Sequence, residues 1–329
     1  MSESRPLKTN PDSNGFARFA RDVWDQAGML LVLVVVFLVC SASVNNFLSW
    51  MNMNGLALSV STIGMISCTM LFCLASGDFD LSIGSVVACA GVLAAVVTNR
   101  TGSVAIGMIS GVLGGGLVGL VNGVIVARLR INALITTLAS MQIVRGFSYM
   151  ISGGKAVGVA QESFYSLGNW SIHGITAPVW YALASFIFFG LLLRSTIFGR
   201  NTLAIGGNRE AARLAGIHVE RTKIVIFTMQ GLMAAFAGVV LASRLTSGQP
   251  GASQGLELEV ISACVLGGVS LAGGVGSMLF VIAGVLIMGI VQNAMNLANV
   301  PTFYQYVARG VILLIAVILD EMKRRTRSS

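Results

Sequence analysis

The sequence predicts an all-α protein, a polytopic bundle of about ten transmembrane helices. Hydrophobic residues make up 55% of the 329 residues, charged residues make up 10%, and the mean hydropathy is +0.83. Globular domains carry about 25% charged residues. Apolar runs such as 28–44, 56–75 and 277–296 approach the roughly 20 residues that a helix needs to cross a bilayer. Helices are predicted because lipid offers no hydrogen-bond partner to an open backbone.

The apolar runs divide into ten predicted spans. They are 28–47, 55–75, 81–98, 103–127, 132–152, 178–194, 222–243, 257–271, 277–297 and 303–320. The glycines and polar residues around 77–82 and 265–277 are also typical of helices broken at membrane depth, so nine or eleven spans fit the pattern as well. One membrane domain, 28–320, therefore lies between an N-terminal tail, 1–27, and a basic C-terminal tail, 321–329.

Basic residues are distributed unevenly about these spans. If the N-terminus is inside, the inside segments hold 16 of the 21 Lys and Arg residues. The other five are Arg100, Lys155 and Arg244 at outer loops or span ends, and Arg145 and Arg309 within spans. The positive-inside rule then predicts that both termini are cytoplasmic. The net charge of +8 is explained by topology, and we expect no nucleic-acid partner.

The first apolar run admits a second interpretation. Arg18 and Arg21, the run 30–40 and the small residues 41–43 have the order of a cleaved signal peptide. The basic region is long and follows a polar tail, and the topology of the other spans works when this one is kept. We therefore favour a first span that is retained.

Residues 195–223 form the longest predicted inside segment and contain no run suited to lipid, so we expect them in the cytosol. Within this segment Asn208 is a good N-cap, and Glu210 lies in the first turn, where the helix dipole favours an anion. Arg213 lies near the last turn, and Gly216 suits the left-handed residue that ends a helix. The pattern predicts a helix of about two turns.

One face of this short helix carries a narrow apolar stripe. Ala211, Leu214 and Ala215 are spaced i, i+3 and i+4, so they share a face. A helix this short is not stable alone in water. Either the chain's own transmembrane helices or the groove of a second protein must brace it. The less specific interpretation is a structured loop.

The segment EAARLAG, 210–216, resembles the signature that permease subunits of ATP-binding-cassette (ABC) importers present to their ATPases. Five stretches resemble the permeases of bacterial importers of the ribose, arabinose and galactose class, and the similarity covers 20–320. These stretches are GRNTLAIGGNREAARLAGI (199–217), GDFDLSIGS (77–85), INALITTLASMQIVRG (131–146), TSGQP (246–250) and ISACVLGGVSLAGGVG (261–276). MLFCLASGDFDLS (70–82) and 131–146 are most similar to permeases of L-arabinose importers.

This resemblance implies a permease like those of type II ABC importers, placed in the bacterial inner membrane as a homodimer. It implies two further partners, a cytosolic ABC ATPase and a periplasmic sugar-binding protein, and a substrate that is L-arabinose or a related pentose. The older signature of other importers ends in a Leu-Pro that is missing after Ile226, so only a coupling role is carried over. The residues that it implies for ATPase coupling are Asn208, Arg209, Glu210, Ala211, Ala212, Leu214 and Gly216.

The sequence offers no chemistry of its own to drive transport. The pattern G-x-x-x-x-G-K-[ST] does not occur, so we expect a separate ATPase, no cofactor and no enzymatic site in this chain. GGGLVG (114–119) fits G-x-G-x-x-G but lies in an apolar run, where small residues favour close packing of helices. With only His173 and His218, both in predicted aqueous segments, we expect no metal site. The five cysteines lie in apolar runs and are interpreted as packing residues.

Asp78 and Asp80 are the best candidates for ionisable residues along the transport path, with Arg145 as a third. In one interpretation the two carboxylates cap a broken helix and accept hydrogen bonds from sugar hydroxyls. In the other, Asp80 is the N-cap of the span that follows, without sugar contact. A different class of protein also fits, an ion-coupled secondary transporter in which Asp78 or Asp80 binds a proton or sodium ion.

Two predicted outer loops, 153–178 and 246–259, are long and polar. Their composition shows only that they contact water. The resemblance implies that a sugar-binding protein docks on them. The candidate docking residues are Lys155, Glu162, Gln249 and Glu257, together with Glu259.

Overall fold

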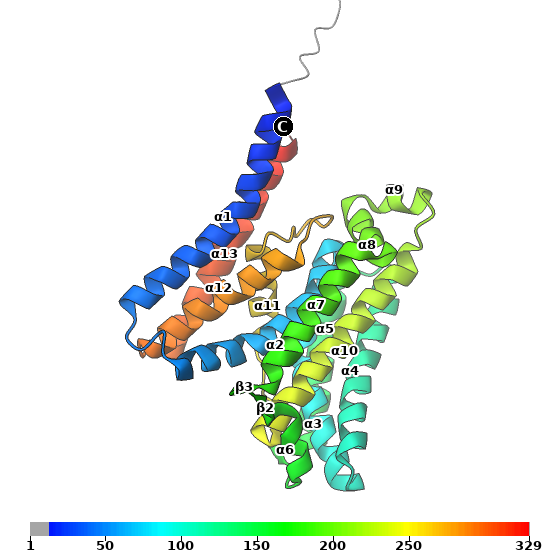
Figure 1. Ribbon diagram of the computed structural model, residues 1–329. Helices are drawn as coiled ribbons and strands as arrows, with labels where there is room; N and C mark the ends of the chain where they lie inside the picture. Colours follow the sequence, from blue (N-terminus) through cyan, green and yellow to red (C-terminus); the bar gives the residue numbers. More distant parts are fainter. Residues whose placement is uncertain (1–12, 329) are drawn as a thin grey trace, which may run out of the picture.

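The computed structural model describes the backbone of residues 13–328 and the side chains of residues 28–318 and 320–322. This part of the chain is a bundle of helices with four strands of two residues each (Figure 1). The helices are α1 (Ser13–Ser43), α2 (Trp50–Ala75), α3 (Ile83–Thr101), α4 (Val104–Ala127), α5 (Ala133–Ser152), α6 (Glu162–Asn169), α7 (Ala177–Ser195), α8 (Ile197–Gly207), α9 (Arg209–Leu214), α10 (Val219–Leu245), α11 (Leu256–Leu266), α12 (Met278–Leu297) and α13 (Thr302–Ser328). The strands are β1 (Val157–Gly158), β2 (Ser171–Ile172), β3 (Ile175–Thr176) and β4 (Ser247–Gly248), paired β1 with β4 and β2 with β3.

Seven of the described helices are long and apolar enough to cross a membrane, namely α2, α3, α4, α7, α10, α12 and α13. The polytopic all-α class predicted from the sequence is therefore confirmed. The apolar part of α1, Gly28–Ser43, is shorter than these spans. The segment predicted as an N-terminal tail is helical from Ser13 onward, and residues 1–12 lie outside the described part.

The predicted span 257–271 is a half-helix. Helix α11 has 11 residues, which at 1.5 Å per residue reach about 16 Å, roughly half of the hydrocarbon thickness. A glycine-rich connection with left-handed backbone at Gly268, Gly273 and Gly274 follows it. Of the alternatives left open around 265–277, the broken helix is the one that the structure shows.

Glycines bring α4 into close contact with α3 and α10. A Cβ added to Gly111 would lie 2.6 Å from the Ala90 carbonyl oxygen and 2.8 Å from Val239. Gly115 and Gly119, within the GGGLVG stretch, likewise face Ala235 and Gly231 of α10 with no room for a side chain. The packing interpretation of this stretch is confirmed.

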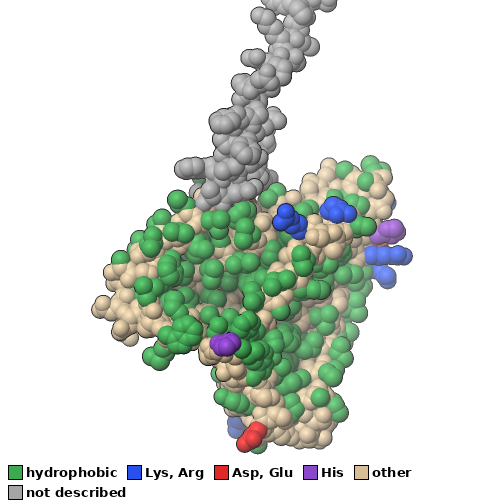
Figure 2. Space-filling model, in the orientation of Figure 1, with side chains coloured by type: hydrophobic (Ala, Val, Ile, Leu, Met, Phe, Trp, Pro, Cys, Tyr) green, Lys and Arg blue, Asp and Glu red, His purple; other side chains and the backbone are tan. Residues whose placement is uncertain are grey.

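The two ends of the bundle differ in what they carry. Figure 1 shows that the ribbon of α1 begins, and α13 ends, at the same end of the bundle as α9, whereas α6, β2 and β3 lie at the opposite end. On the face shown in Figure 2, hydrophobic side chains cover the middle of the molecule, while charged side chains gather at its upper edge and lower tip. This distribution is that of a membrane protein with two wet ends.

The connection between α10 and α11 does not stay at the end of the bundle. It starts at β4, which pairs with β1, and β1 is held to the end of α3 because the Asn99 amide donates to the Gly158 carbonyl at 2.8 Å. From there Gly248 packs against Gly91, and the Ser253 carbonyl lies against Gly84 near the start of α3. Seven residues of helix separate these two glycines, a descent of about 10 Å. The connection 249–255 therefore re-enters the bundle beside α3.

Candidate functional site

Helix α9 forms as its local signals predict. The Asn208 side chain accepts a hydrogen bond from the Ala211 N–H at 2.9 Å, as an N-cap does, and Glu210 and Arg213 occupy the first and last turns. Gly216 has φ +83°, a left-handed conformation that favours glycine. The helix begins and ends where the sequence places its caps.

Two faces of α9 have different environments. Ala212 is buried and packs with Ile205, Val219 and Ile217 of the same chain, which fixes the helix to its flanking segments. The predicted stripe of Ala211, Leu214 and Ala215 faces outward, and Leu214 is 87% exposed. The chain itself braces α9 through Ala212, and the stripe is left open to a partner.

The junction between α8 and α9 is in backbone contact with two other segments. Gly206 lies so close to the Ala75 carbonyl, at the end of α2, that an added Cβ would overlap it, and such a Cβ would lie 2.5 Å from the Gly274 nitrogen. The Gly274 N–H in turn donates to the Ala75 carbonyl at 2.9 Å. We call this contact of Ala75, Gly206 and Gly274 the glycine junction. At this junction the backbone before α9 touches the end of α2 and the connection between α11 and α12 without an intervening side chain.

A buried ion pair lies near this junction. The Lys223 ammonium, in the first turns of α10, is 2.7 Å from the Asp78 carboxylate, and their side chains are only 7% and 9% exposed. Asp78 follows α2, so the pair joins the segment after α9 to the segment after α2. In the sequence Lys223 contributes only to the count of inside charges, because no local pattern places it beside a carboxylate.

Asp80 belongs to a separate polar chain of contacts. Its carboxylate accepts hydrogen bonds from the Ser82 N–H at 2.9 Å and the Ser82 hydroxyl at 2.6 Å. The Asn122 amide donates to the same hydroxyl at 3.1 Å, and the Ser140 hydroxyl donates to the Asn122 carbonyl oxygen. Burial raises the pKa of Asp80, while the two bonds from Ser82 lower it. The N-cap of α3 is Ser82, so Asp80 is not the N-cap that one interpretation predicted, and its carboxylate is occupied by Ser82.

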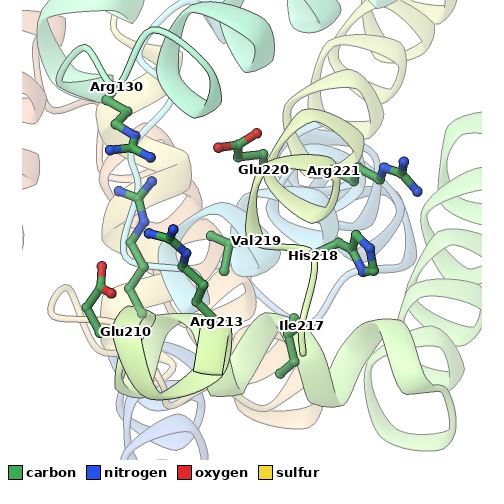
Figure 3. Close-up of a pocket in the computed structure, with 9 residues that line it drawn as sticks. Arg130, Glu210, Arg213, Ile217, His218, Val219, Glu220 and Arg221 are labelled. Carbon is green, nitrogen blue, oxygen red and sulfur yellow. The ribbon is translucent and has the colours of Figure 1, made fainter. Parts of the chain in front are cut away.

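A positively charged cleft of about 450 Å³ opens beside α9. It is lined by Arg130, Arg209, Glu210, Arg213, Ile217, His218, Val219, Glu220 and Arg221. Figure 3 shows the side chains of Arg130, from the connection between α4 and α5, and Arg213, from α9, extending into the same space. Arg130 has φ +57°, an uncommon backbone conformation for a residue with a side chain. The cleft presents four guanidinium groups and two carboxylates beside the stripe on α9.

The remaining sequence-predicted residues lie elsewhere. Arg145 donates from one guanidinium nitrogen to the carbonyls of Pro250 and Ala252, at 2.8 Å each, and so holds the re-entrant connection against α5. Lys155, Glu162 and Gln249 are exposed. The carboxylate of Glu257 lies against α3 at Gly84, and Glu259 pairs with Arg309 of α13.

Residues 52–317 match the family described as "Branched-chain amino acid transport system / permease component". The chain belongs to this family of transport permeases, and the resemblance inferred from its motifs is confirmed.

Individual relatives, whose names state the sugar that they transport, are similar to this chain over nearly its whole length. The chain is 61% identical to the L-arabinose transport system permease protein AraH of Escherichia coli (strain K12), over 93% of each chain. It is 52% identical to the L-arabinose ABC transporter permease protein AraH of Azospirillum brasilense, over 99% of this chain and 98% of the relative. It is 36% identical to the ribose import permease protein RbsC of Bacillus subtilis (strain 168), over 92% and 94%. No solved structure shows a significant match.

Proposed function

We propose that this chain is the membrane-spanning subunit through which L-arabinose, or a related pentose, enters a bacterial cell in an ATP-driven importer. The observation that carries the proposal is the 61% identity to an L-arabinose permease over nearly the whole chain. The structure supports it with a bundle of helices suited to crossing a membrane and a short braced helix that exposes an apolar stripe.

The partners follow from the two ends of the bundle. A cytosolic ATPase docks on the stripe of Ala211, Leu214 and Ala215 and on the charged cleft beside it, so the end that carries α9 and both termini is cytoplasmic. A periplasmic sugar-binding protein docks at the opposite end, where Lys155 and Glu162 are exposed, and reaches the exposed Gln249 at the start of the re-entrant connection. Glu257, which lies against α3, is not part of this docking surface. A second copy of the chain completes the membrane part.

The contacts behind α9 give ATP-driven movement a path into the membrane. Ala212 ties α9 to Val219 at the start of α10, so the two move together. The glycine junction ties the support of α9 to the end of α2 and to the connection between α11 and α12, and the pair of Lys223 and Asp78 ties α10 to the segment after α2. Interfaces of this kind convert a small shift at one site into movement of whole helices. A displacement of α9 by the ATPase therefore shifts α2, α10 and the connection between α11 and α12 relative to α5.

The same contacts disfavour an ion-coupled transporter. Such a transporter needs a carboxylate that is free to bind and release a cation. Asp78 is paired with the Lys223 ammonium, and Asp80 is hydrogen-bonded by Ser82. Neither carboxylate is available for that role in this conformation.

Reconstitution tests the proposal. The chain is placed in proteoliposomes with its ATPase and binding protein, and uptake of labelled L-arabinose, D-ribose and D-galactose is compared. We expect uptake that requires ATP on the side of the membrane where the ATPase is bound. This uptake should prefer L-arabinose and persist in the presence of an uncoupler. Uptake that an uncoupler abolishes, and that needs no ATPase, would support the ion-coupled alternative.

A further inference from the structure

One face of α5 carries polar side chains at the level where the re-entrant connection meets it. Gln142, Arg145 and Tyr149 are spaced i, i+3 and i+7, so they form a single stripe along the helix. Arg145 donates to the carbonyls of Pro250 and Ala252, and a Cβ on Gly251 would lie 3.4 Å from the Tyr149 hydroxyl. The stripe and the connection 249–255 therefore form one continuous surface.

This surface lies within the length of the bundle. The connection runs along α3 from Gly91 back to Gly84, toward the N-terminal end of that helix. Gln142 lies nearly one turn before Arg145, toward the N-terminal end of α5. Non-helical backbone at membrane depth is tolerated only where it is buried in protein or lines a water-filled cavity. Gln142 and Gln254 are nevertheless exposed in the single chain.

Helix α4 shows what a face directed at lipid looks like in the same molecule. Its exposed side chains between 105 and 121 are all apolar, and they include Ile106, Ile109, Leu113 and Leu117. A glutamine amide in contact with acyl chains would lose its hydrogen bonds to water without replacement. The surface that carries Gln142 and Gln254 is therefore not directed at lipid.

We propose that Gln142 and Gln254 line a water-filled passage between two copies of this chain and form hydrogen bonds with the hydroxyls of the sugar as it passes. An amide both donates and accepts, which suits a neutral polyhydroxy compound. Apolar side chains on the same face of α5, Ile135 and Leu138, are 63% and 40% exposed and seal the passage against the second copy. One chain supplies only one wall, so the site is complete only in the dimer. This inference rests on the proposed function.

The role of Arg145 in this surface is to position the connection. Its two bonds to the connection, at Pro250 and Ala252, hold the segment that leads to Gln254 against α5. One guanidinium nitrogen of Arg145 is engaged with backbone carbonyls, and the uncharged polar groups along this surface are the amides of Gln142 and Gln254 and the hydroxyl of Tyr149. A wall of neutral groups binds a sugar weakly and releases it.

Cysteine labelling tests the passage directly. Gln142→Cys and Gln254→Cys are introduced into a chain in which the half-buried Cys40 and Cys89 are replaced by Ser, and the full transporter in membranes is treated with a water-soluble thiol reagent. The matched control is Leu113→Cys on α4, where the leucine is 61% exposed. We expect both glutamine positions to be labelled, and L-arabinose supplied with the binding protein to slow the labelling, while Leu113→Cys is not labelled. Glutamine positions that resist the reagent as Leu113→Cys does would overturn the proposal.

Transport measurements test the contact with the sugar. Gln142→Leu and Gln254→Leu should each lower the rate of L-arabinose uptake about threefold to tenfold, the effect of one or two neutral hydrogen bonds, while binding of the ATPase stays unchanged. Normal uptake in both variants would overturn the assignment of sugar contacts. Failure of the proposed function would appear instead as an unmodified complex that moves no L-arabinose.

Discussion

Leu214 gives the sharpest test of how α9 engages the ATPase. In the free chain this side chain is 87% exposed, so it contributes almost nothing to the stability of the permease. Replacement by alanine removes three carbons whose burial against a partner is worth about 2 kcal/mol. That loss corresponds to a Kd for the ATPase that is roughly thirtyfold weaker.

The measurement is the affinity of the purified ATPase for the permease in nanodiscs, with the Tm of each permease variant recorded in parallel. Leu214→Ala should weaken binding without lowering the Tm. The control is Ile197→Ala on α8, an isoleucine that is 67% exposed and outside the stripe. Equal affinities for the Leu214→Ala variant and the unmodified chain would refute the assignment of the stripe as the docking face, as would an equal loss in the control.

Three further predictions concern the contacts behind α9 and the packing of the bundle. Lys223→Met should destabilise the chain by about 3–5 kcal/mol because it leaves the Asp78 carboxylate buried and unpaired. The double variant with Asp78→Asn should recover most of the Tm, while the number of ATP molecules hydrolysed per sugar transported stays elevated. A double variant that hydrolyses the normal number of ATP molecules per sugar would exclude the pair from coupling. Gly111→Ala should cost about 1–3 kcal/mol by overpacking, whereas Gly146→Ala, with nothing within 4 Å of the added carbon, should not lower the Tm. Asn208→Ala should cost the short helix about 0.5–2 kcal/mol, seen as faster hydrogen exchange of its amides; unchanged exchange would contradict the role of the cap.

The parts of the structure that were predictable from the sequence are those that local signals determine. Asn208 and Gly216 mark the ends of α9 because a cap and a left-handed stop are properties of a few neighbouring residues. The glycines of 114–119 indicate close helix packing for the same reason. The coupling role of these segments came from the resemblance to a family.

The parts that were missed depend on where distant segments meet. Residues 246–259 are polar and were therefore interpreted as an outer loop, because hydropathy alone does not distinguish a loop in water from a connection that lines a passage. The pairing of Lys223 with Asp78 joins residues far apart in the chain, so neither neighbourhood indicates it. The half-helix α11 was predicted as a full span because the apolar run that ends in Val265 and Leu266 is followed by glycines, which lie outside the helix.

The mutual neutralisation of Lys223 and Asp78 has an electrical consequence. A single charge that crosses the full membrane field costs about 2.3 kcal/mol per 100 mV, which would make each conformational step sensitive to voltage. Here the ammonium and the carboxylate are 2.7 Å apart and shift together, so their displacement carries no net charge. This pair should therefore add no voltage dependence to the import of an uncharged sugar, whereas a charge left unpaired there, as in Lys223→Met, should add one.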